Sequence, residues 1–282
     1  MSAEDMSKIA VVTDSSSQLS QQQVDAHGIT VVPITIVLDG ESFSDGVDLD
    51  VDDFYERLGS GVRVSTSQPS PGDFVRAWTK TVEDGATEIV SVHVGSELSG
   101  TLNSARLAAQ ELDVPIHIID SNLTSYGLGQ LTLAIVDELR RTGSTDGIES
   151  FAAGVIASLS TVFILQDLKY VLRGGRMRQA ELPSGTQDIP VLGGSGGRYD
   201  LLGTGRTIDD LVDKMADALL DGDHQRHVAI ALAAPDTIEF TEKLEARMHA
   251  SRLVESVHRY RMGPAIAVHT GPGTAGGFAW PA

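Results

Sequence analysis

The sequence predicts an α/β protein of two domains, an N-terminal domain built on a parallel sheet and a second α/β domain. In the first half of the chain, short apolar runs alternate with segments of helical periodicity, a pattern typical of a parallel sheet covered by helices. The length of 282 residues suits two domains of ordinary size, and 41% hydrophobic residues can fill their cores. The character of the sequence changes near residue 155, so we expect domains at 1–155 and 156–282.

Four apolar runs predict the strands of the first domain, at residues 8–13, 30–38, 88–94 and 115–119. Helical patterns lie between and after them, at residues 73–82, 101–112 and 129–140. Ligands of parallel sheets collect at the carboxyl ends of the strands. Three of the four predicted strands lead into small polar pairs, which are Asp14-Ser15, Gly95-Ser96 and Asp120-Ser121. These strand ends are the first indication of a binding site.

The second half of the chain predicts further strands and helices around a glycine-rich segment. Strand-like runs occur at residues 161–165, 227–233 and 265–269, and helical patterns at 166–172, 208–220 and 237–250. Residues 174–205 are rich in glycine, so we expect an irregular entry to the second domain.

Composition excludes several classes of protein. The net charge of −18, from 21 basic and 39 acidic residues, disfavours binding to nucleic acid. The chain has no cysteine, so disulfides and thiolate chemistry are excluded, and its eight histidines show no metal-ligand spacing. No apolar run is long enough to span a bilayer, and the start of the sequence does not resemble a signal peptide. We therefore expect a cytoplasmic protein without a metal or cofactor. The sequence leaves the oligomeric state open, and we favour a monomer.

Two motif matches fail on their context. Residues 193–197 fit G-x-S-x-G, but a nucleophile elbow needs a helix directly after Ser195, and none is predicted. Residues 271–276 fit G-x-G-x-x-G, but too little chain follows for the rest of a dinucleotide-binding unit. The sequence also lacks a P-loop motif, which disfavours an ATPase.

Three polar positions keep a chemical and a structural interpretation open. Asp14 follows a predicted strand, where it serves either as an aspartyl nucleophile or as a helix cap. Ser99 precedes Gly100 and a predicted helix, so it caps that helix or helps to bind a carboxylate or phosphate at the helix N-terminus. The loop at residues 65–73 is either a turn in which Ser70 or Asp73 caps the next helix, or a site at which Thr66 and Ser67 point donors outward.

An ordered set of segments, spread over nearly the whole chain, resembles the DegV family, the fatty-acid-binding components of bacterial fatty acid kinase. The segments are AVVTDSSSQL at residues 10–19, VPITIVLDGESFSDG at 32–46, STSQP at 65–69, LSGTLNSA at 98–105, IDSNLTSYGLG at 119–129, LKYVLRGGRM at 168–177 and HTGPG at 269–273. No single segment is specific, but their order is.

The resemblance implies a two-domain DegV-like fold with the ligand between the domains. It implies that the protein holds a long-chain fatty acid such as palmitate in an apolar tunnel and is not itself an enzyme. A separate ATP-dependent kinase would form the acyl phosphate for phospholipid metabolism, with at most transient contact with a membrane surface. The alternatives are a hydrolase or phosphatase using Asp14 or Ser99, and a lipid-responsive regulatory module.

The resemblance also assigns roles to residues. Thr66, Ser99 and His269 would bind the carboxylate, and Arg173, Ser67 and Gly100 would support them. Arg206 would engage the kinase. The chain departs from the family pattern at Leu172, where an arginine is usual, in residues 189–192, which lack the usual lysine, and in the polar stretch 177–190. These departures affect the expected lid, acyl-chain fit and kinase docking, and leave the carboxylate residues in place.

Overall fold

A computed structural model of the protein describes residues 8–175 and 188–282. The chain divides into two compact units, unit 1 with residues 1–35 and 67–156, and unit 2 with residues 36–66 and 157–282. The sequence assigned residues 36–66 to the first domain, whereas their contacts place them in unit 2. The chain therefore enters unit 2 at residues 36–66, returns to unit 1, and enters unit 2 again at residue 157.

Unit 1 contains the predicted parallel sheet, in the strand order β2-β1-β6-β7. Its strands are β1 (Ile9–Asp14), β2 (Ile29–Val32), β6 (Glu88–His93) and β7 (Ile116–Asp120), and each pairs in parallel with its neighbours. The predicted strand at 30–38 is in fact two strands in different sheets, β2 and β3 (Thr35–Leu38). Pro33 lies between them, and proline cannot donate to a sheet ladder.

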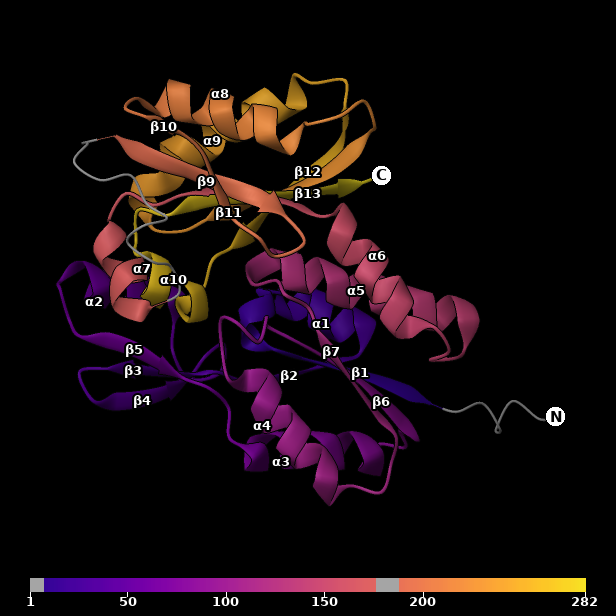
Figure 1. Ribbon diagram of the computed structural model, residues 1–282. Helices are drawn as coiled ribbons and strands as arrows, with labels where there is room; N and C mark the ends of the chain where they lie inside the picture. Colours follow the sequence, from indigo (N-terminus) through magenta and orange to yellow (C-terminus); the bar gives the residue numbers. More distant parts are fainter. Residues whose placement is uncertain (1–7, 176–187) are drawn as a thin grey trace. The chain divides into compact units, whose positions relative to one another are not determined.

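Helices cover both faces of this sheet (Figure 1). Helices α3 (Pro71–Glu83) and α4 (Thr101–Ala108) lie on one face, and α5 (Ser125–Thr142) lies on the other. The side chains that pack between the sheet and α3 and α4 include Phe74, Trp78, Ala105, Ala108, Val12, Val32 and Ile89. The predicted helix 101–112 ends as an α-helix at Ala108 and continues as a 3-10 turn, Ala109–Glu111. The remaining helices of this part of the chain are α1 (Gln21–His27) and α6 (Ile148–Ser158).

A capping box starts α3. The Ser70 side chain accepts a hydrogen bond from the Asp73 amide, and the Asp73 carboxylate accepts one from the Ser70 amide. Pro71 occupies the first helical position, where its missing N–H costs nothing. Ser70 is thus the helix cap that the sequence left open between two residues.

Unit 2 is built on a six-stranded sheet in the order β10-β9-β8-β13-β11-β12. Its strands are β8 (Ser160–Ile164), β9 (Ile189–Ser195), β10 (Asp200–Gly205), β11 (Arg226–Leu232), β12 (Val254–Arg261) and β13 (Ala275–Pro281). The β11–β12 pair is parallel, and the other pairs are antiparallel. A mixed sheet of this kind fits the predicted second α/β domain.

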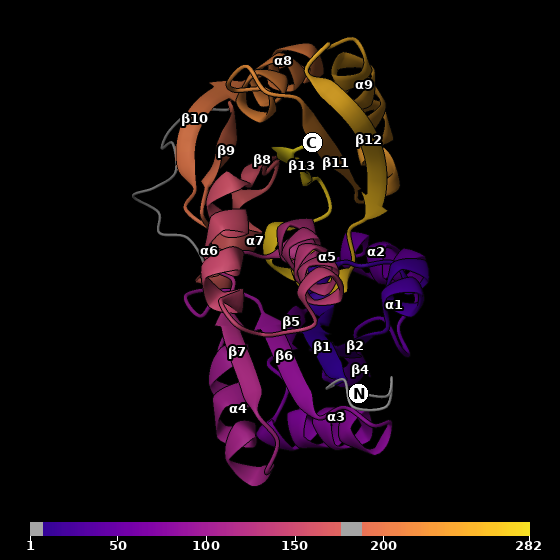
Figure 2. The same cartoon turned by 90° about the vertical axis from the view of Figure 1, so that its right-hand side faces the viewer.

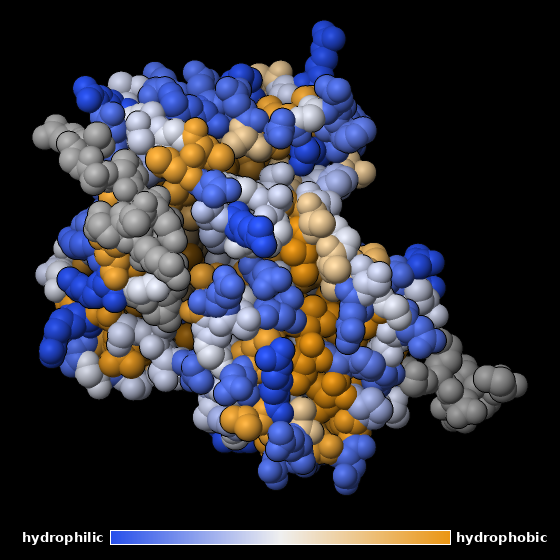
Figure 3. Space-filling model, viewed as in Figure 1, coloured by the Kyte–Doolittle hydropathy of each residue, from blue (hydrophilic) through white to orange (hydrophobic). Residues whose placement is uncertain are grey.

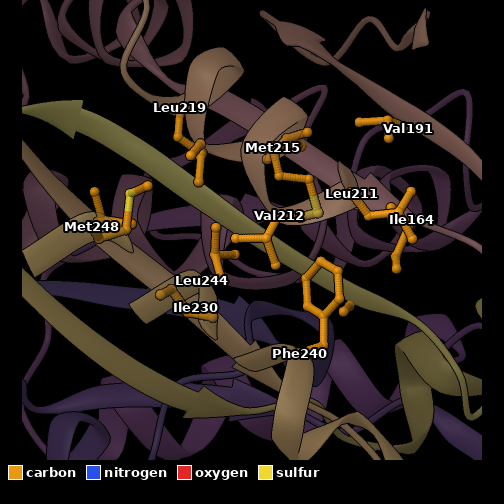
Figure 4. Close-up of a cluster of buried hydrophobic side chains, with 14 of the residues drawn as sticks. Ile164, Val191, Leu211, Val212, Met215, Leu219, Ile230, Phe240, Leu244 and Met248 are labelled. Atoms are coloured by element: carbon orange, nitrogen blue, oxygen red, sulfur yellow. The ribbon is translucent and has the colours of Figure 1, made fainter. Parts of the chain in front are cut away.

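Helices α8 (Ile208–Leu219) and α9 (Ile238–His249) lie together on one face of this sheet (Figure 2). Met215 of α8 and Leu244 of α9 point toward sheet residues such as Ile230 (Figure 4). Hydrophilic side chains cover the outer surface of α8 (Figure 3). The helix is therefore amphipathic, with its apolar stripe facing the sheet.

The opposite face of the six-stranded sheet packs against α7 (Leu168–Gly174), through Leu165, Val171 and Leu192. Residues 36–66 add α2 (Val51–Gly59), β3, β4 (Glu41–Ser44) and β5 (Val64–Ser67), and these strands form a small sheet in the order β4-β3-β5. Helix α10 (Pro264–Thr270) contacts both α2 and α7.

Two predictions for the second half of the chain are wrong. Residues 265–269 form part of α10 rather than a strand. Pro264 occupies the first position of this helix, which favours a helix start, but a short apolar run fits a buried helix and a buried strand equally well. Residues 189–205 form the β9–β10 hairpin rather than an irregular segment. Its glycines allow close packing, since a Cβ on Gly193 would lie 2.7 Å from the Thr161 carbonyl oxygen. Residues 176–187 of the glycine-rich segment lie outside the described residues.

We expect Gly129→Ala to destabilise the protein and Gly154→Ala to stabilise it. A Cβ on Gly129 of α5 would lie 2.5 Å from the Ser17 carbonyl oxygen. On Gly154 of α6, a Cβ would meet no heavy atom within 4 Å among the described residues. The first change should cost about 2 kcal/mol or more through overpacking, and the second should gain up to about 1 kcal/mol of helix propensity. Denaturant unfolding of both variants measures this, and equal shifts would contradict the close approach of α5 to residue 17.

Candidate functional site

Ser99 lies in the turn between β6 and α4 of unit 1. Its hydroxyl oxygen lies 2.8 Å from the Thr101 hydroxyl oxygen and accepts a longer hydrogen bond, 3.3 Å, from the Thr101 amide. Gly100 is the N-cap residue of α4, so Ser99 stands one residue before the cap. The first turn of a helix presents N–H groups and the positive end of the helix dipole, which favour an anion. Ser99 is thus not the N-cap itself, and its position suits an anion such as a carboxylate or phosphate, the other interpretation that the sequence left open.

Gly100 allows the side chain of Gln68 to lie against this turn. A Cβ at residue 100 would lie 2.0 Å from the Gln68 side-chain oxygen. The Gln68 amide nitrogen donates to the Ser104 hydroxyl of α4, at 3.2 Å. Gln68 follows Thr66 by two residues, so the STSQP loop contacts the residue next to Ser99. Sequence reasoning did not single out Gln68, although it lies within a segment that carries the family resemblance.

Asp14 is fully buried at the carboxyl end of β1, and hydrogen bonds occupy both of its carboxylate oxygens. One oxygen accepts from the amide and hydroxyl of Ser16, and the other accepts from the Val94 amide at 3.0 Å. His93 Nδ1 lies 3.1 Å from this second oxygen, and His93 Nε2 lies 2.7 Å from the Ser91 hydroxyl oxygen. Asp14 is the N-cap of the 3-10 helix Ser15–Ser17, as the capping interpretation predicted, and its burial disfavours a role as a nucleophile.

In unit 2, Thr66 and His269 are brought together from residues far apart in the sequence. Thr66 lies on β5 and His269 in the last turn of α10, and the Thr66 hydroxyl oxygen is 2.8 Å from His269 Nε2. Both side chains are partly exposed. When Nε2 carries the proton, it donates to the threonine oxygen and leaves the threonine hydrogen to bind an acceptor. In that tautomer the pair presents an oriented hydroxyl donor.

Helix α2 fixes the start of α10. The buried Tyr55 hydroxyl of α2 donates to the Met262 carbonyl at 2.9 Å, two residues before α10 begins. Arg261 lies over the Tyr55 ring, 5.1 Å from its centroid, and pairs with Asp52 of the same helix. Burial raises the pKa of Tyr55, which keeps its hydroxyl protonated as a donor. Residues 36–66 thus carry Thr66 and also support the helix that carries His269.

The other predicted residues occupy separate places. Ser67 is exposed at the end of β5, and Arg173 is exposed in the last turn of α7. Arg206 follows β10, is exposed, and forms an ion pair with Asp188. Ser195 ends β9 and leads into the turn before β10 rather than into a helix, so the G-x-S-x-G match is not a nucleophile elbow.

Within residues 8–175 and 188–282, no group of three or more His, Asp or Glu side chains has the arrangement of a metal site. No helix of this described part of the chain is long and apolar enough to cross a membrane.

The chain belongs to the DegV family, which matches residues 8–282. A DegV domain-containing protein of Streptomyces coelicolor is 32% identical over 274 residues, covering 95% of this chain and 96% of that protein. This finding confirms the resemblance that the ordered segments indicated.

Solved structures of DegV proteins share the fold. A fatty-acid-binding DegV family protein from Thermus thermophilus superposes with a TM-score of 0.89 at 29% identity, covering 98% of this chain and all of that one. A stearic acid-binding protein from Eubacterium ventriosum superposes with a TM-score of 0.86 at 26% identity, covering 97% of this chain and 98% of that one. The predicted fold class is therefore confirmed, and both of these similar proteins bind fatty acids.

We expect Tyr55→Phe to lower the free energy of unfolding by about 1 to 2 kcal/mol, because the buried Met262 carbonyl loses its donor. Tyr199→Phe is the matched control, since the buried Tyr199 hydroxyl has no hydrogen-bond partner among the described residues. Its removal should leave stability unchanged or slightly higher. Denaturant unfolding at neutral pH measures both variants, and a Tyr55→Phe protein as stable as the control would contradict the anchoring of α10.

Proposed function

We propose that this protein binds a long-chain fatty acid and that Ser99, Thr66 and His269 hydrogen-bond its carboxylate. The observation that carries the proposal is the Thr66–His269 hydrogen bond, which orients the Thr66 hydroxyl as a donor when His269 Nε2 carries the proton. Ser99 adds a second hydroxyl beside a helix N-terminus. The fatty acids bound by similar DegV proteins supply the class of ligand.

The physical chemistry of a fatty acid fits these groups. Each buried CH2 contributes roughly 0.8 kcal/mol, so a chain of about sixteen carbons offers on the order of 10 kcal/mol before entropy costs. The carboxylate then needs only a few oriented donors. Because the net charge of −18 opposes an anion at long range, a cation is useful, and we assign that supporting role to Arg173 on α7, the helix that contacts α10.

We assign the protein the role of a non-catalytic carrier. It would hold the fatty acid through the carboxylate and present it to a separate ATP-dependent kinase. The exposed Arg206 would contact that kinase. Two observations disfavour an enzyme. The Asp14 carboxylate is buried and its oxygens are occupied, and the Ser99 hydroxyl bonds to Thr101 rather than to a histidine base.

Purified protein should release a long-chain fatty acid that mass spectrometry detects after denaturation. Ser99→Ala and Thr66→Val should each weaken fatty acid binding by about 10- to 100-fold, because a hydrogen bond to a charged group contributes about 1.5–3 kcal/mol. Calorimetric titration of delipidated protein measures these losses. Thr132→Val serves as a control, since Thr132 is a buried threonine that bonds to the Leu128 carbonyl of its own helix.

Two outcomes would contradict the proposal. Delipidated wild-type protein that binds no fatty acid would exclude the carrier function. Hydrolysis of acyl or phosphate esters by wild-type protein, lost in Ser99→Ala, would favour a hydrolase.

A further inference from the structure

The turn that carries Ser99 is held by a row of side chains across three strands. In the sheet order β1-β6-β7, the register pairs Thr13 with Val92 and His93 with Asp120, so Asp14, His93 and Asp120 align at the carboxyl ends. An aspartate therefore flanks β6 on each side, just where the chain leaves the sheet toward Ser99.

Three consecutive amides of this turn have acceptors on the neighbouring strands or on the loop that follows β7. The Val94 amide donates to Asp14 at 3.0 Å, the Gly95 amide donates to the Leu123 carbonyl at 2.9 Å, and the Ser96 amide donates to Asp120 at 3.1 Å. The turn is thus fixed at successive backbone positions rather than by one contact.

These hydrogen bonds fix the backbone at Gly95, and Gly95 in turn holds the backbone of Ser99. The Gly95 carbonyl accepts hydrogen bonds from the Leu98 amide at 2.9 Å and from the Ser99 amide at 3.2 Å. Gly95 itself packs tightly, since a Cβ there would lie 2.9 Å from the Asn122 Cα atom. A shift of Val94 or Ser96 would therefore move the acceptor that locates the Ser99 backbone.

We infer that Asp14 and Asp120 form a carboxylate clamp that positions Ser99 for the ligand carboxylate. The two acids bind backbone N–H groups and do not touch the ligand, so they are positioning residues. This inference rests on the proposed function, because it gives the clamp a role in head-group binding. It also explains why an anion-binding turn is flanked by acids, which would otherwise only repel the ligand.

The two aspartates differ in a way that allows a sharp test. At Asp120, the same carboxylate oxygen, Oδ1, accepts from both the Ser96 and the Asn122 amides. An asparagine offers one carbonyl oxygen and can replace it. At Asp14, both oxygens accept from backbone amides, those of Ser16 and Val94, so an asparagine leaves one amide without an acceptor in either orientation.

The test compares palmitate with 1-hexadecanol, which has the same chain length and lacks the carboxylate, both delivered from cyclodextrin to delipidated protein. Asp120→Ala should weaken palmitate binding by about 5- to 10-fold and change hexadecanol binding by less than about twofold, because only the head-group contact depends on the turn. Asp120→Asn should bind both ligands within about twofold of wild type. Asp14→Asn should weaken palmitate binding selectively, as Asp120→Ala does.

A purely electrostatic role predicts the opposite result, since removal of either negative charge would strengthen palmitate binding. The inference is overturned if Asp120→Ala binds palmitate as wild type does, or if it loses affinity for both ligands equally, which would indicate a general structural defect. If Asp14→Asn does not fold, the Asp120→Ala and Asp120→Asn pair decides the question.

Hydrogen exchange separates the clamp from the proposed function. Without ligand, the amides of Leu98 and Ser99 should exchange faster in Asp120→Ala than in wild type and in Asp120→Asn, and equal rates would overturn the clamp. Failure of wild-type protein to bind palmitate, together with the expected exchange rates, would contradict the proposed function and leave the clamp supported.

Discussion

The packing of residues 36–66 against the rest of unit 2 is the constraint on which the Thr66–His269 pair depends. These residues interrupt unit 1 in the sequence, yet their helix α2 is fastened to the residues before α10 by Tyr55 and Arg261. The same segment ends in β5 with Thr66. Residues 36–66 therefore position both partners of the hydrogen bond between Thr66 and His269.

In unit 1, the Ser99 hydroxyl is positioned by a tightly packed turn. The glycines of this turn allow close approach, Gly95 to the backbone of Asn122 and Gly100 to the side chain of Gln68. Backbone hydrogen bonds to neighbouring strands and to the loop after β7 fix the turn. In each unit a hydroxyl is held by hydrogen bonds to neighbouring groups, which favours preorganised binding groups over adaptable ones.

The sequence predicted most of the parallel sheet and its helices, because apolar periodicity and turn residues report local structure directly. It also indicated the strand ends, and it left Asp14 open between a helix cap and a nucleophile, because the hydrogen bonds that Asp14 accepts from Ser16 and Val94 become visible only in the fold. The sequence could not predict that residues 36–66 belong to unit 2, since periodicity does not say which sheet a strand joins. Residues 265–269 were wrongly predicted as a strand, because a short apolar run fits a buried helix equally well. Gln68, Tyr55 and Asp120 act through contacts between segments distant in sequence, so no local pattern marks their roles.

A crystal structure of the delipidated protein reloaded with palmitate tests the central claim most directly. We expect both palmitate carboxylate oxygens within hydrogen-bonding distance, about 2.5–3.0 Å for O–H···O, of the Ser99 and Thr66 hydroxyl oxygens, with the Thr66–His269 contact retained. A carboxylate bound elsewhere, with Ser99 and Thr66 both facing solvent, would contradict it.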